Sequence, residues 1–83
     1  MENRLALLGI IVENADSVER LNKILHEFRA YIIGRMGIPY KQREVCVISV
    51  TLDAPPAIIS SLSGKVGMLQ GVTSQVLLAK INE

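Results

Sequence analysis

The sequence predicts an α+β domain in which two helices cover one face of a four-stranded antiparallel sheet. Three observations support this fold class. Short apolar runs occur at residues 4–13 and 45–52. Apolar residues at helical spacing occur in two segments between the strand-like ones. The chain has 83 residues, which is the length of one small domain, so a single domain over residues 1–83 is expected. The expected order of elements is strand, helix, strand, strand, helix, strand.

The first strand and the first helix follow each other directly. "RLALLGIIVE", from Arg4 to Glu13, is a nearly continuous apolar run, which is typical of a central strand with both faces covered. A helix is expected from about Ser17 to Ala30, with Asp16 as its N-cap. The helix is supported by one apolar stripe at helical spacing, formed by Val18, Leu21, Leu25, Phe28 and Ile32.

The middle of the chain predicts two further strands. "AYIIGRMGIPY" opposes a helix because it contains Gly34, Gly37 and Pro39. We expect a short, irregular strand here, at an edge of the sheet, because Pro39 cannot donate to a strand ladder. "VCVISVTL", residues 45–52, is the clearest strand, and Cys46 shares one of its faces with the apolar residues that alternate along it.

The last third of the chain predicts a helix and a final strand. In "DAPP", Asp53 is a plausible N-cap and the prolines suit a first helical turn. The final strand is expected over residues 71–81. This order of elements is that of a ferredoxin-like βαββαβ fold. One sheet face would lack helices although its strands are apolar on both sides, so we expect a homodimer or homotetramer through the sheet face or edge.

Composition narrows the classes of function. Nine basic and eight acidic residues are interspersed and give a net charge of +1. No segment approaches the roughly 20 apolar residues of a membrane-spanning helix, so no membrane association is expected. RNA binding on such a sheet needs aromatic residues on its central strands, so we expect no direct contact with nucleic acid. A single cysteine fits a reducing cytoplasm.

The stretch "SLSGKVGMLQGV" resembles a phosphate-binding loop at first sight. A Walker loop requires a glycine five residues before the glycine-lysine pair, and serine or threonine after it. Here Ile59 and Val66 stand at those positions around Gly64 and Lys65, which excludes the motif. Gly71 is expected to end the second helix. For Gly64 and Gly67 two interpretations stay open: close packing of the helix on a neighbour, or a backbone patch that faces a ligand or a partner subunit.

Chemistry-bearing residues are sparse. His26 is the only histidine and Cys46 the only cysteine, and neither belongs to a metal-binding spacing. The sequence shows no recognisable pair of nucleophile and base, so we expect that the protein is not an enzyme and has no catalytic residues. We also expect no metal site. The sequence identifies no cofactor. Arg35, Lys41 and Arg43 surround the "GRMGIPYKQRE" segment, either as a solvated turn or as a small site for an anion or a partner.

Two motifs resemble those of a known family. "GRMGIPY" and "LSGKVGMLQGV", together with "LHEF" in the first helix, are similar to segments of the iron-only hydrogenase system regulators. That family is similar to ACT domains and to the C-terminal domain of the nickel-responsive repressor. The resemblance implies an ACT-like fold that associates through its sheets and can bind a small ligand between subunits. It carries over no nickel site, because His26 and Cys46 do not reproduce the histidines and cysteine of the repressor.

The resemblance implies a small non-enzymatic regulatory module, acting as a homo-oligomer that senses a ligand at a subunit interface. The candidate ligand-binding or interface residues are Gly64, Lys65, Gly67, Arg35 and Gly37. The alternative is an interaction or accessory protein for a metalloenzyme maturation system that binds no ligand.

Overall fold

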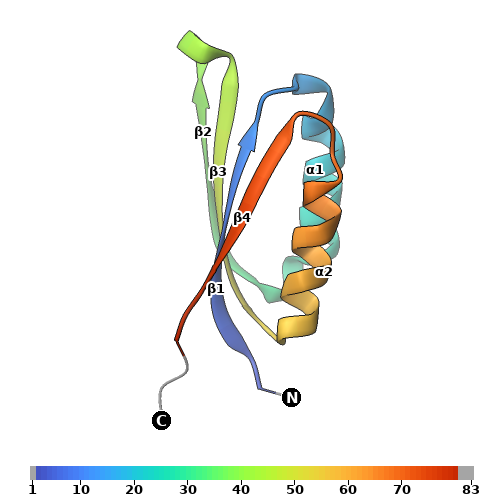
Figure 1. Ribbon diagram of the computed structural model, residues 1–83, viewed down its shortest axis with the longest axis vertical. Coiled ribbons are helices and arrows are strands. Elements are labelled where there is room, and N and C mark those ends of the chain that lie inside the picture. Colours follow the sequence, from blue (N-terminus) through green and yellow to red (C-terminus); the bar gives the residue numbers. More distant parts are fainter. Residues whose placement is uncertain (1, 81–83) are drawn as a thin grey trace.

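The computed structural model describes residues 2–80 and has the predicted ferredoxin-like arrangement (Figure 1). The sheet order is β2-β3-β1-β4, and all three pairs of neighbouring strands are antiparallel. The elements are β1 (Arg4–Val12), α1 (Val18–Glu27), β2 (Ile32–Tyr40), β3 (Val45–Ala54), α2 (Pro56–Gly67) and β4 (Val72–Leu78).

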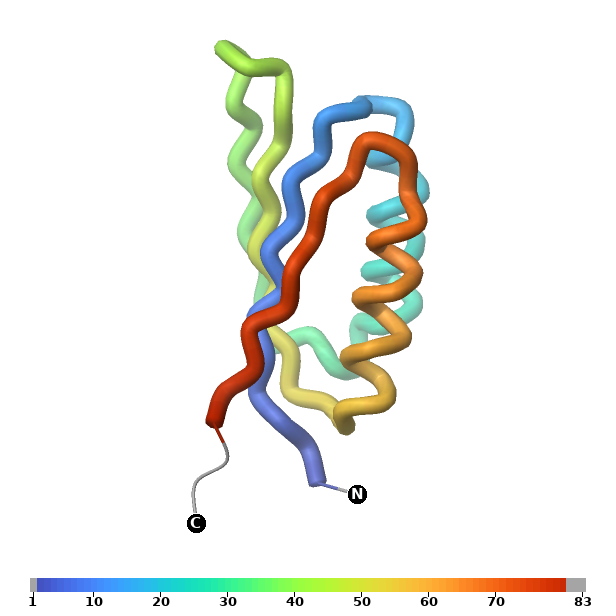
Figure 2. Tube along the Cα trace, viewed as in Figure 1, coloured from blue at the N-terminus to red at the C-terminus, as the bar shows by residue number. Residues whose placement is uncertain are grey.

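Both helices lie on the same side of the sheet, which the chain trace shows clearly (Figure 2). Alternate residues of β1 point toward them, so that every second side chain of this strand is buried. Apolar side chains from both layers close the space between them. The fully buried side chains that fill this core are Leu8, Ile10, Leu21, Leu25, Val50, Leu52, Leu62 and Val66.

Hydrogen bonds join the connection between β1 and α1 to the connection between α2 and β4. The hydroxyl of Ser17, which is buried, donates to the carbonyl of Gln70 at 2.6 Å, and the backbone N–H of Glu13 donates to the carbonyl of Gly71 at 2.7 Å. Gly71 has a φ of 72°, and a Cβ added to it would lie 2.5 Å from the Cβ of Asn14. Only glycine fits this position, because it tolerates both the left-handed backbone and the close approach.

The predicted helix caps were wrong. The side chain of Asn14, not that of Asp16, accepts a hydrogen bond from the backbone, at 2.9 Å from the Asp16 nitrogen. Asp53 is not an N-cap because it is still paired in β3, opposite Leu5, and Pro55 precedes the helix instead. Strand pairing therefore extends further than the residue types suggested.

Several boundaries also differ from the prediction. Helix α1 ends at Glu27 and is continued by a separate 3-10 turn, Arg29–Tyr31, so Ile32 begins β2 instead of ending the helical stripe. Strand β2 is nine residues long and therefore not short, although a register shift near Ile33 makes it irregular as expected. Helix α2 ends at Gly67, four residues before Gly71. The last strand, expected over residues 71–81, spans Val72–Leu78, and residue 81 of that prediction lies outside the described residues.

The sheet surface that faces away from the helices is hereafter called the outer face. None of residues 2–80 forms a layer over it (Figure 1). By strand register, Asp53 is the only charged residue of the described strands on this face. Its exposed large apolar side chains are Leu5, Leu7, Ile11, Met36, Ile38, Tyr40, Val47 and Leu77. The prediction of an uncovered apolar sheet face is thus confirmed for the single chain.

Substituting alanine at two glycines should have opposite effects. Gly71→Ala forces a side chain into the left-handed region and against Asn14, so we expect a loss of about 2 kcal/mol or more in the free energy of unfolding. Gly64→Ala adds a methyl group inside α2, where a Cβ meets nothing within 4 Å, and should add about 0.5–1 kcal/mol. Urea denaturation of both variants measures the change in the free energy of unfolding. A change of the same sign in both variants would contradict the roles given to these two glycines.

Candidate functional site

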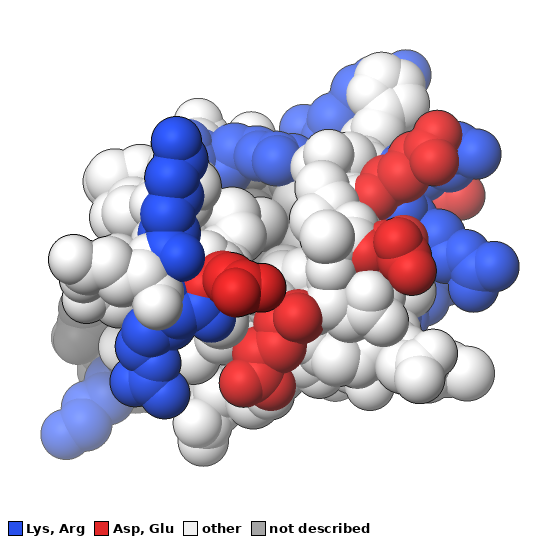
Figure 3. Space-filling view, turned by 90° about the horizontal axis from the view of Figure 1, so that it is seen from above, with Lys and Arg blue, Asp and Glu red and all other residues white. Residues whose placement is uncertain are grey.

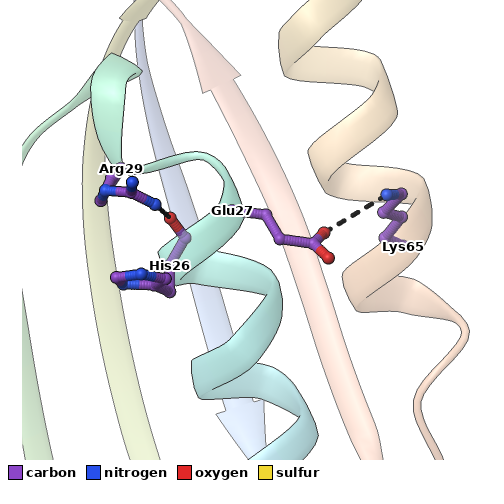
Figure 4. Close-up of polar contacts among 4 residues, drawn as sticks. All are labelled: His26, Glu27, Arg29 and Lys65. Atoms are coloured by element: carbon purple, nitrogen blue, oxygen red, sulfur yellow. Dashed lines mark hydrogen bonds and ion pairs between the residues drawn. The ribbon is translucent and has the colours of Figure 1, made fainter.

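Lys65 projects from α2 toward α1. Its Nζ lies 3.4 Å from the Oε1 of Glu27 (Figure 4). The same Nζ lies 5.5 Å from the centre of the Phe28 ring. The side chains of the ion pair are 52% and 60% exposed, so water screens the attraction and the pair contributes at most about 1 kcal/mol. Lys65 thus has a structural partner, but its ammonium group is still accessible to an anion.

Gly64 lies on another side of α2. It lines a groove of about 420 Å³ between α2 and β4, together with Ile59, Ser63 and Val76. Nothing packs against Gly64, so close packing of the helix does not explain this glycine. Gly67 is in ordinary contact only, since a Cβ added to it would lie 4.0 Å from the Oγ of Ser74. The other interpretation, that Gly64 faces a ligand or a partner subunit, stays a prediction.

Arg35 and Gly37 lie on β2, on the side of the sheet that carries the helices. The Arg35 guanidinium donates to the Oδ1 of Asn22 in α1 at 2.9 Å. At Gly37 an added Cβ would be 3.8 Å from the side chain of Ile48. Beyond Ile32, every residue of β2 is exposed, because the helices do not extend over this strand.

The five predicted residues therefore do not form one site. Arg35 and Gly37 are on the edge strand, Lys65 faces α1, and Gly64 opens toward β4. A ligand bound within a single chain could not contact all of them. They could still contribute separately to contacts with other subunits.

A smaller cleft, which the sequence analysis missed, lies under the β2–β3 hairpin. It has a volume of about 220 Å³ and is lined mainly by apolar side chains, among them Val12, Val18, Pro39 and Cys46. The hairpin projects past the helix layer, which leaves the inner side of its tip uncovered (Figure 1). The cleft could not be predicted from residue types, because it depends on how far the β2–β3 hairpin extends beyond the helices. The Cys46 side chain is half-buried here.

The remaining polar residues that the structure describes are dispersed over its surface (Figure 3). His26 is exposed on α1, where its backbone carbonyl accepts a hydrogen bond from Arg29 at 2.9 Å (Figure 4). Within residues 2–80, no three histidine, cysteine or acidic side chains are grouped closely enough to hold a metal ion. Acidic and basic side chains are interspersed over the end of the molecule seen in Figure 3.

A family model matches residues 4–76, most of the chain. Its description is TM1266-like, "Iron-only hydrogenase system regulator, putative". The chain belongs to this family. The family resemblance inferred from the central and C-terminal motifs is thereby confirmed. A search of curated proteins found no match to the chain.

Two solved structures agree with the fold. The uncharacterized protein TM1266 from Thermotoga maritima is 30% identical, with a TM-score of 0.91 over 95% of this chain and 100% of that one. A formyltetrahydrofolate deformylase from Pseudomonas putida KT2440 is 14% identical, with a TM-score of 0.63 over 88% of this chain and 28% of the deformylase. The second likeness supports the ACT-like form of the ferredoxin-like fold. Among the described residues, no helix has the length and hydrophobicity needed to cross a bilayer.

Proposed function

We propose that the chain is a small, non-enzymatic regulatory module of the iron-only hydrogenase system that acts as a homo-oligomer in the cytoplasm. The observation that supports this proposal is the open outer face, on which the described strands place many apolar side chains and one charged residue, Asp53. Contiguous apolar surfaces of this kind mark sites of protein association. The family description supplies the regulatory context.

The total surface of the chain supports an assembly. A folded monomer of 9.1 kDa is expected to expose about 4,900 Å². The chain exposes 5,941 Å², which is roughly 1,000 Å² more than that expectation. A standard interface buries about 800 Å² per partner. The excess is thus similar in size to the area that one partner buries in such an interface.

Regulation would work by linkage between ligand binding and assembly. A ligand that binds across a subunit interface stabilises the arrangement that forms its site. Arg35 and Gly37 suit this role because β2 is a sheet edge that is exposed on both faces. On α2, Gly64 leaves the backbone open and Lys65 carries a cationic group. Gly67 is the last residue of the helix and has no side chain that would obstruct a partner.

The alternative is an accessory protein that binds no ligand and contributes to a metalloenzyme maturation system by protein contacts alone. The dispersion of the five candidate residues favours it, because these residues form no enclosed site within one chain. Neither version requires a direct contact with nucleic acid, and the interspersed charges offer no extended basic surface at the end seen in Figure 3.

The oligomer is tested by the molar mass in solution. Light scattering coupled to gel filtration, at micromolar protein concentration, should give twice or four times the mass of the 9.1 kDa chain. The physical reason is burial of the apolar strand surface. A monomeric mass throughout a micromolar concentration series would refute the homo-oligomer.

Ligand sensing is tested by thermal-shift screening against amino acids, nucleotides and divalent metal ions. A ligand of the assembled form at saturation should raise the Tm by about 4 °C or more. Gly64→Ala and Lys65→Ala should reduce this shift if α2 contacts the ligand, whereas Lys23→Ala, an exposed lysine on α1, serves as the control. The absence of any shift, with an intact oligomer, would contradict the sensor and favour the accessory protein.

A further inference from the structure

We propose that a second copy of this chain packs on the outer face, sheet against sheet, instead of pairing with an edge strand. This inference rests on the proposed homo-oligomer and specifies its interface. Pairing along β2 would satisfy the free backbone groups of one edge. It would leave the apolar side chains of the two central strands, β1 and β3, exposed to water. Only a contact over the face removes them from water.

The outer face has two apolar bands, which follow from the strand register. One band contains Leu7, opposite Leu77 on β4, with Leu5 beside it on the same strand. The other contains Ile11, opposite Val47 on β3. Val47 is in turn opposite Ile38 on β2, so this band continues across three strands.

Between the bands the surface is low at Gly9 of β1, although Gln75 of β4 and Met36 of β2 belong to the same row. Gly9 lies opposite Ser49 on β3 and Gln75 on β4, so the central strand has no side chain in the middle of the face. A Cβ added at Gly9 would meet only the backbone oxygen of Gln75, at 3.9 Å. The absence of a side chain there is therefore not required by packing within the chain. A facing sheet could approach the backbone closely at Gly9.

The size and the chemistry of the face suit a second copy. Four strands spaced by about 4.8 Å, with nine residues at about 3.4 Å each, outline roughly 19 by 30 Å, or about 570 Å² in projection. Accessible area exceeds the projected area of a corrugated surface, so the face is comparable with the roughly 800 Å² per partner of a standard interface. Homodimer interfaces are more apolar than other interfaces, and charge is depleted at the interface core. This face, with Asp53 as the one charged residue that the described strands place on it, has that composition.

The test places charge on the central strands, where a substitution cannot affect edge pairing directly. Leu7→Lys and Ile11→Lys introduce ammonium groups at positions that are 40% and 43% exposed in the single chain. A two-fold contact buries each substitution twice, so we expect the dimer Kd to rise about 100-fold or more. Met68→Lys is the matched control: Met68 is 86% exposed at the end of α2, away from the sheet, and its substitution should leave the Kd unchanged.

Sedimentation equilibrium measures the Kd, and far-ultraviolet circular dichroism with urea unfolding confirms that each variant is folded. If a lysine variant does not fold, the double variant Leu7→Thr and Ile11→Thr replaces it, because threonine suits an exposed strand position. A wild-type dimer that none of these changes weakens would overturn face-to-face packing while leaving the homo-oligomer intact. A wild-type monomer would overturn both, and a different protein would then be the occupant of the face.

Discussion

The structure depends on one-sided burial of the sheet. Leu8 and Ile10 of β1 and Val50 of β3 are removed from water because α1 and α2 lie over them, and the helices have their own apolar stripes only on the side that meets the sheet. A chain with two helices can cover a four-stranded sheet on one face only. The strands nevertheless carry apolar residues on both faces, so folding of the single chain leaves part of its hydrophobic surface in water.

The positions of the glycines follow from this two-layer arrangement. Gly71 joins α2 to β4 where the two turns at the end of the core meet, and its left-handed backbone and contact with Asn14 belong to the fold itself. Gly64 and Gly9 differ, because neither is required by contacts within the chain. Gly64 leaves the backbone of α2 open beside β4, and Gly9 lowers the middle of the outer face. The part of either glycine in contacts beyond the single chain belongs to the proposals made above.

Much of the fold could be predicted from sequence because hydrophobic periodicity is a local property. The apolar run at residues 4–13 was sufficient to place a central strand, and the single proline of β2, Pro39, to place an edge strand. Asp53 was mistaken for a helix cap because its pairing with Leu5 is a contact between distant segments, which residue type does not reveal. The candidate site was harder to predict for the same reason. Adjacent residues Gly64 and Lys65 point to different sides of α2, one toward β4 and one toward α1, so proximity in sequence did not produce a common site.

The central claim, that the outer face is covered by another copy of the chain, makes stability depend on concentration. Binding between native chains stabilises the folded state by mass action, so the Tm of an oligomer rises with protein concentration. Calorimetry of the wild-type protein over a hundredfold concentration range tests this most directly. The account predicts a Tm that increases steadily with concentration. A reversible transition with the same Tm at every concentration would contradict it, since a monomer unfolds independently of its neighbours.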